Sequence, residues 1–513
     1  MDMGSPSVAR YWLDDEGHNM KKLLPLLLTT ALACCFTVPT MAEDAAVSKE
    51  AKKVEETATP QADETDTQLQ GFVIRHQVDN AKMSEGENIK ADPLVLLHTL
   101  KADVTKYLET KKPLNLKTTV TPILAERLDK ELKNVPALIL ETFIDEEGQG
   151  ETKFDVPKYK HTVPEDKNGG EVDIDWKGLD GQFVYPETFE NIKADLTLQG
   201  LSISEKDAFS MALGQLKFVA ELDEDLLPLK MKSTLPSLMF KDDMSKLTLA
   251  KLALETEMQV TASQVEISQG KFNIGNASFD VANKNNAKLQ AFQLTFGGEE
   301  KDKTVSLMAN LSVKDWTLSE AIMGETLTLN HTLDVALNHL DAPATAQLQQ
   351  TVRELQNQLH SGKISEDILN FAMFGQLMQL APAFLAKSPE LALSNIHIST
   401  KNKGKLNGNL QLGVNGQKAK SLTNMMELLM ALTMQADFKM DKPLLKLALT
   451  ASLGSEGSAD TRIKALLKDK TIVETEENYT LSATIVDNKL TLNGQDMGAP
   501  MDLFMLLMPL AIQ

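Results

Sequence analysis

The stretch Val305-Ser306-Leu307-Met308-Ala309-Asn310-Leu311-Ser312-Val313 places an apolar side chain at every second position. A period of two is typical of a β-strand with one buried face, because successive side chains point to opposite sides of the sheet. Similar alternation recurs at residues 327–337, 410–414, 432–440 and 445–453. Parallel strands covered on both faces have unbroken apolar runs instead, so the pattern predicts antiparallel sheets with one apolar face.

Helical periodicity interrupts these strands in one place above all. Apolar residues recur at helix spacing over residues 348–359, Gly362 is expected to end that helix, and residues 364–385 predict a second, more apolar helix. Further helices are predicted at residues 93–108, 125–132, 421–432 and 461–467, and a buried strand at 137–144. The predicted fold class is therefore α+β: long antiparallel sheets with an inserted helical hairpin, forming either a closed sandwich or an open curved trough.

Changes in composition divide the chain into seven predicted segments. They are an extension upstream of the translation start (1–19), a signal peptide (20–42), a disordered acidic tether (43–70), a mixed α/β segment (71–170), an antiparallel β segment (171–343), the helical hairpin (344–392) and an α+β C-terminal segment (393–513). Within the last of these, Met501–Ile512 is almost wholly apolar, with Asp502 and Pro509 as its only breaks.

The signal peptide is predicted from Lys21-Lys22, the apolar run Leu23–Val38 and the small residue Ala42 that follows. The run is shorter than the roughly 20 residues that span a bilayer, so cleavage after Ala42 and export to the periplasm are expected. Two alternatives remain open. Acylation of Cys34, which follows Ala31-Leu32-Ala33, would tether the chain, and an uncleaved segment would anchor it in the inner membrane.

The overall composition argues against several classes of function. Both cysteines, Cys34 and Cys35, lie in the removed segment, which leaves the exported chain without disulfides or thiol chemistry. The net charge of −20 disfavours a nucleic-acid partner, since phosphates require a basic surface. None of the common nucleotide-binding, hydrolase-elbow or zinc-peptidase motifs occurs, so we expect no enzymatic activity, no cofactor and no metal site.

A few polar residues invite a functional interpretation and are better explained as structural. His331 and His339 share the parity of the apolar positions around them, but eight residues separate them by about 27 Å on a strand, which is too far to share an ion. Asp173 and Asp175 resemble the start of a calcium loop that lacks its later ligands. Ser204 is expected to cap a helix. The methionines at 425, 426, 430, 434, 440, 501, 505 and 508 are expected to fill a core, and the alternative is an apolar wall that adapts to irregular ligands such as acyl chains.

Three motifs carry a family resemblance. They are Phe374–Pro382 followed by Leu385–Leu391, Tyr479–Leu481 with Leu490–Gly494, and Trp176–Gly181. Over about residues 171–494 the chain resembles the YdgA family of bacterial envelope proteins of unknown function. The resemblance implies a β-rich protein in the periplasm or at the inner membrane of a Gram-negative bacterium, with no functional residues to carry over.

Together these observations predict an exported cell-envelope protein without covalent chemistry. An open trough with an apolar concave face would hold hydrophobic ligands such as lipids. The alternative is a structural or scaffold protein of the envelope with closed sheets. The identity of the ligand or partner and the oligomeric state stay open.

Overall fold

A computed structural model of the chain describes residues 69–499, apart from 80, 109–112, 165–169, 207, 225, 282–284, 320–325, 361–363, 420–424 and 454. The predicted signal peptide, almost all of the tether and the apolar C-terminal stretch lie outside the described residues. The α+β prediction is confirmed, because long antiparallel strands dominate the described part. The chain forms two compact units: residues up to 228 with 235–243 make unit 1, and residues 229–234 with those from 244 onward make unit 2.

Unit 1 contains two antiparallel ladders. The first runs in the order β2 (Glu87–Lys90), β1 (Leu69–Val78), β3 (Leu114–Leu124), β4 (Leu138–Ile144), β5 (Gly150–Val156), β8 (Leu179–Tyr185), β9 (Ile192–Leu198) and β12 (Leu216–Leu222). The second runs in the order β6 (Tyr159–Val163), β7 (Val172–Trp176), β10 (Leu201–Glu205), β11 (Phe209–Leu213) and the end of β13 (Pro228–Asp242).

Two helices pack on these ladders. Helix α2 (Pro93–Leu108) has the predicted bounds, and α3 (Glu126–Leu132) differs from the prediction by one residue. Leu108 at the end of α2 joins a buried cluster with Leu116 and Ile144 of the sheet. Leu128 and Leu132 of α3 join a second cluster built on β7, β10 and β11. Because both helices bury apolar side chains against strands, they are fixed in place beside the sheet.

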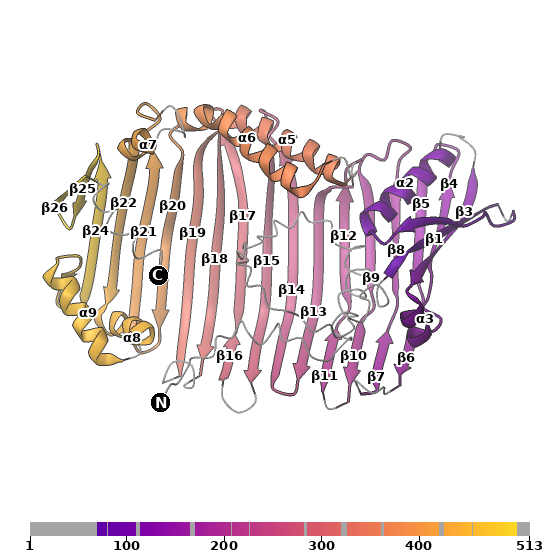
Figure 1. The fold of residues 1–513 in the computed structure, drawn as a ribbon, viewed down its shortest axis with the longest axis horizontal. Helices are drawn as coiled ribbons and strands as arrows, with labels where there is room; N and C mark the ends of the chain where they lie inside the picture. The colour runs from indigo at the N-terminus through magenta and orange to yellow at the C-terminus, as the bar shows by residue number, and fades with distance from the viewer. Residues whose placement is uncertain are drawn as a thin grey trace, which may run out of the picture. The chain divides into compact units, whose positions relative to one another are not determined.

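Unit 2 is a meander in which almost every strand pairs with its neighbour in sequence (Figure 1). Its strands are β14 (Ser245–Val260), β15 (Glu266–Val281), β16 (Asn285–Leu289), β17 (Ala291–Lys301), β18 (Thr304–Leu318), β19 (Leu327–Asp341), β20 (Glu390–Thr400), β21 (Gly404–Val414), β22 (Leu432–Asp441), β23 (Val473–Glu474), β24 (Asn478–Val486), β25 (Lys489–Leu492) and β26 (Gln495–Gly498). The quoted stretch 305–313 lies in β18, as its alternation predicts.

The predicted helical hairpin is confirmed as α5 (Ala342–His360) and α6 (Glu366–Ala386). These helices lie at one end of the unit 2 strands, whereas α8 (Lys442–Leu453) and α9 (Glu456–Lys468) lie at the opposite end (Figure 1). Helix α7 (Met425–Ala431) precedes β22. Ala342 of α5 is fully buried in a cluster with Val265, Ile267 and Val305, so α5 covers the first residues of the apolar sheet face.

One predicted strand is wrong: residues 445–453 form helix α8. Leu444, Leu447, Ala448 and Ala451 recur at helix spacing in the same stretch, so the sequence is compatible with both periods. Leucine and alanine are strong helix formers, and the stretch lacks the valine and isoleucine that favour strands. Pro443 at the second position of α8 suits the first turn of a helix, where its missing N–H costs little.

Candidate functional site

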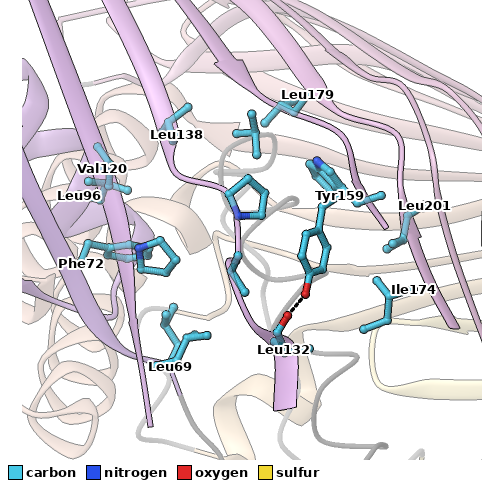
Figure 2. A pocket seen from close by; sticks show the side chains of 16 residues that line it. Leu69, Phe72, Leu96, Val120, Leu132, Leu138, Tyr159, Ile174, Leu179 and Leu201 are labelled. Atoms are coloured by element: carbon cyan, nitrogen blue, oxygen red, sulfur yellow. Dashed lines mark hydrogen bonds between the residues drawn. The ribbon is translucent and has the colours of Figure 1, made fainter. Parts of the chain in front are cut away.

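Unit 1 contains a partly open apolar pocket made of two adjoining lobes. The first lobe, shown in Figure 2, has a cavity volume of about 140 Å³. Its lining residues are Leu69, Phe72, Leu96, Val120, Pro122, Leu124, Leu132, Val135, Pro136, Leu138, Val156, Tyr159, Ile174, Trp176, Leu179 and Leu201. No charged side chain is among them. They come from both ladders of the unit and from α2 and α3, so the lobe depends on the fold of the whole unit.

The second lobe has a volume of about 110 Å³ and shares Leu96, Leu138 and Leu179 with the first. Leu96, Leu100 and Val104 of α2 line it at four-residue intervals. Side chains four residues apart lie on one face of a helix. This face of α2 therefore forms one wall of the pocket, and the sheet forms the other.

Two side chains in the first lobe carry a hydrogen-bond donor. The hydroxyl of Tyr159 donates to the backbone carbonyl of Leu132, the contact drawn in Figure 2. Burial raises the pKa of Tyr159 above its ordinary value. The Nε1 of Trp176 is buried and has no hydrogen-bond partner among the described residues. A buried indole N–H without a partner costs about 1–3 kcal/mol, so it marks a place where an acceptor would be favourable.

The polar side chains at the second lobe are hydrogen-bonded to one another or to neighbouring side chains. Asp103 is 6% exposed and accepts from His76 Nε2 at 3.2 Å, while the other ring nitrogen of His76 lies 2.9 Å from the hydroxyl of Thr118. Asp103 also accepts from the ammonium of Lys106 at 2.8 Å. Because Asp103 belongs to α2 and His76 to β1, these hydrogen bonds connect the helix to the sheet.

A second set of hydrogen-bonded polar side chains lines the same lobe. The Thr142 and Thr152 hydroxyls lie 2.8 Å apart, and Thr152 lies 2.8 Å from the hydroxyl of Tyr185. Burial raises the pKa of Tyr185, although its hydrogen bonds to the threonines partly oppose the effect. All of these groups have hydrogen-bond partners within the protein. Among the polar groups described for the two lobes, the Nε1 of Trp176 is therefore the one without a partner.

Unit 2 carries a different apolar feature, which we call the leucine row: Leu307, Leu337, Leu391 and Leu412. Each is directly paired with the next across adjacent strands, so all four point to one face of the sheet. Their exposed fractions lie between 37% and 39%. Val305, two residues before Leu307 on the same face, is fully buried under α5. The cover that α5 gives this face therefore ends before the leucine row.

Helix α6 adds a further exposed apolar surface in unit 2. Its residues Ile368–Ala386 form the one helix in the described ranges that is long and apolar enough to cross a membrane. Phe371 is 80% exposed and Phe374 is 62% exposed. Such large aromatic side chains are seldom left in water on a soluble protein without a binding role.

The polar residues considered from sequence do not form a site. Nδ1 of His331 donates to the carbonyl of His397 at 3.1 Å, and Nδ1 of His339 contacts the carbonyl of Ser388 at 3.3 Å. Among the described residues no group of three or more histidine, cysteine or carboxylate side chains could hold a metal. The predicted helix cap at Ser204 is wrong, because Ser204 lies within β10 and pairs with Asp173 of β7.

Sequence reasoning missed the pocket. The sequence indicated Trp176 only as part of the family motif Trp176–Gly181, and it predicted the helix at residues 93–108 without assigning it a functional role. The available signal was the four-residue spacing of Leu96, Leu100 and Val104, which gives α2 an apolar face. The convergence of that face with Trp176 depends on strand pairings that alternation alone does not specify.

Comparison with protein-family models gives one match. Residues 210–500, more than half of the chain, match the model of DUF945, described as a bacterial protein of unknown function. The chain belongs to the DUF945 family. Searches of curated proteins and of solved structures found no match. The matched range covers unit 2 and the end of unit 1, so most of the pocket-lining residues precede it.

Proposed function

We propose that this member of the DUF945 family is an exported cell-envelope protein that holds a hydrophobic ligand, such as a lipid acyl chain, without covalent chemistry. The observation that carries the proposal is the two-lobed apolar pocket of unit 1, whose first lobe is lined by Trp176, a residue with a buried and unpartnered Nε1. Apolar pockets with a few well-placed polar groups are the usual form of a small-molecule binding site.

The size of the lobes limits the ligand. A protein cavity of about 150 Å³ lined by aliphatic side chains holds one benzene, which has six carbon atoms. On that scale the first lobe takes about six carbons and the second about four, so the two adjoining lobes together take about ten. A medium-length acyl chain fits this estimate better than a sterol or a complete phospholipid does.

The polarity of the first lobe suggests which head group accompanies the chain. The N–H of Trp176 can donate to a carbonyl oxygen, which would remove the cost of its burial. A carboxylate would bring a charge into a lobe that no cationic side chain lines, and burying an unpaired charge is expensive. We therefore infer a neutral acyl ester or amide rather than an ionised fatty acid.

The location in the envelope is part of the same proposal. It is supported by the pattern of Lys21-Lys22, Leu23–Val38 and Ala42. The exposed phenylalanines of α6 favour contact with the inner membrane. The resemblance of three sequence motifs to those of the YdgA family of envelope proteins supports the same location. Mass analysis of the exported form should find an N-terminus at Glu43, and an N-terminus at Met20 would instead support an anchored protein.

Ligand binding can be tested through Trp176 itself. In a chain carrying W12F and W316F, Trp176 is the one remaining tryptophan. Titration with methyl dodecanoate should change its emission in a saturable way. Leu138→Phe should fill the junction of the lobes and abolish the change, whereas Val219→Phe, at a half-exposed position of β12, should preserve it. Absence of any change, together with no co-purifying lipid in native mass spectrometry, would favour the alternative of a scaffold protein.

The preference for an ester has its own readout. Trp176→Phe keeps an aromatic ring and removes the donor. We expect native mass spectrometry to find weaker binding of the methyl ester by roughly fivefold, in line with one hydrogen bond of about 1 kcal/mol, and unchanged binding of dodecane. Equal losses for both ligands would show that the indole serves packing alone.

A further inference from the structure

The leucine row continues across the sheet to the point where the described chain ends. Beyond Leu412 the directly paired residues are, in order, Met434, Ile485, Leu490 and Gly498. Gly498 is the last residue of β26. The described chain therefore ends beside one end of an apolar row whose other end, at Leu307, is half exposed.

The segment that follows is long enough to cover this row. From Gly498 on β26 to Leu307 on β18 there are seven inter-strand steps, about 34 Å at 4.8 Å each. Residues 499–513 span up to about 50 Å when extended. Leu391 and Leu412 are nearer, at five and four steps, about 24 Å and 19 Å.

The chemistry of the two surfaces matches. Met501–Ile512 is apolar except at Asp502 and Pro509, and it contains the methionines at 501, 505 and 508, which adapt to irregular surfaces. A solvated stretch of this composition is unfavourable, as is a row of half-exposed leucines. Burying each surface against the other removes both costs without a partner molecule.

We propose that the C-terminal segment, residues 499–513, folds back over the leucine row of the same chain and closes the apolar face that α5 leaves uncovered. The contact is intramolecular, because the segment is attached at the end of the row and so has a high effective concentration there. The apolar face of unit 2 is then a closed core, and this inference is independent of the ligand proposed for unit 1.

Photocross-linking in the full chain tests the contact. With p-benzoylphenylalanine in place of Leu391, irradiation should attach the side chain to a peptide within residues 499–513. The same replacement at Met308 is the matched control, because Met308 is 44% exposed and points to the opposite face of β18. It should give no such adduct. Leu412 provides a second position on the row if the Leu391 variant does not fold.

Each other outcome overturns the proposal. In a mixture of isotope-labelled and unlabelled chains, an adduct that joins two chains would show that a second copy occupies the row. An adduct to lipid would show a lipid-binding face, and absence of the peptide adduct from both row positions would show that the segment lies elsewhere. As a second readout, a chain ending at Gly498 should bind at least about twice as much anilinonaphthalene sulfonate as the full chain, because the leucines are uncovered. Equal dye binding would contradict the proposal.

Discussion

Removal of the Asp103 carboxylate should weaken the attachment of α2 to the sheet of unit 1. A carboxylate can only accept, so His76 Nε2 carries a proton and donates it to Asp103, while Nδ1 of the same ring lies 2.9 Å from the Thr118 hydroxyl. In Asp103→Ala the Nε2–H of His76 loses its partner in a part-buried site, at a cost of about 1–3 kcal/mol. Lys106 also loses a partner, but its side chain is 71% exposed and returns to water at little cost.

Urea unfolding followed by the emission of Trp176, in the W12F and W316F background, measures this cost in unit 1. A loss of about 2 kcal/mol at a slope of about 2 kcal/mol/M lowers the midpoint by about 1 M. Lys106→Ala is the matched control, since it removes the exposed partner of the same carboxylate and should lower the midpoint by less than about 0.5 M. An unchanged midpoint in Asp103→Ala, or equal falls in both variants, would refute the assignment of His76 as the group that depends on Asp103. Asp103→Ala should also weaken binding of the methyl ester, because α2 forms one wall of the pocket.

Other residues give sharp tests of packing and pH dependence. A Cβ at Gly150 would lie 2.1 Å from the ring of Tyr185, so Gly150→Ala should destabilise the protein by about 1–3 kcal/mol. A Cβ at Gly375 in α6 would have nothing within 4 Å, so Gly375→Ala should stabilise the protein by up to about 1 kcal/mol. Thermal unfolding of the two variants compares these effects. Burial raises the pKa of Tyr185 above 10.0, so folding favours the neutral phenol. The stability from this group is present below pH 10.0 and is lost as the pH rises towards the raised pKa, and alkaline unfolding curves should show that loss reduced in Tyr185→Phe. The side-chain amide of Gln349 accepts from the N–H of Glu266 at 2.9 Å and donates to its carbonyl at 2.7 Å, so Gln349→Ala should speed hydrogen exchange at the Glu266 amide by about tenfold.

Much of the fold was predictable because many of its strands are long and apolar on one side only. The alternation at residues 305–313 and 432–440 identifies β18 and β22, and the spacing of residues 348–359 identifies α5. The prediction failed at residues 445–453, where leucine and alanine fit two periods at once. Local pattern cannot decide between them there, because the choice depends on which surface Leu444 and its neighbours cover.

The candidate site was beyond the reach of local pattern for a related reason. Its walls come from α2, β3, β4, β7 and β10, and their approach depends on pairings between strands far apart in sequence. The unpartnered state of the Trp176 nitrogen is likewise a property of the assembled surroundings. The leucine row is an intermediate case. Each leucine is predictable as part of an apolar face, but the alignment of the four depends on the strand register. That register is shifted by β-bulges near His339 and Asn395.

The order of strands in unit 2 bears on how the chain acquires its structure. From β18 to β22 each strand hydrogen-bonds to the strand that precedes it along the polypeptide, with helices inserted but no strand passed over. Loop closure between sequence neighbours is entropically cheap. During synthesis from the amino end, unit 2 therefore adds one strand at a time to the growing edge of its sheet, without waiting for strands that are distant in sequence. Each new strand pairs with the exposed edge of the preceding strand, which limits the time during which that edge can bind other molecules.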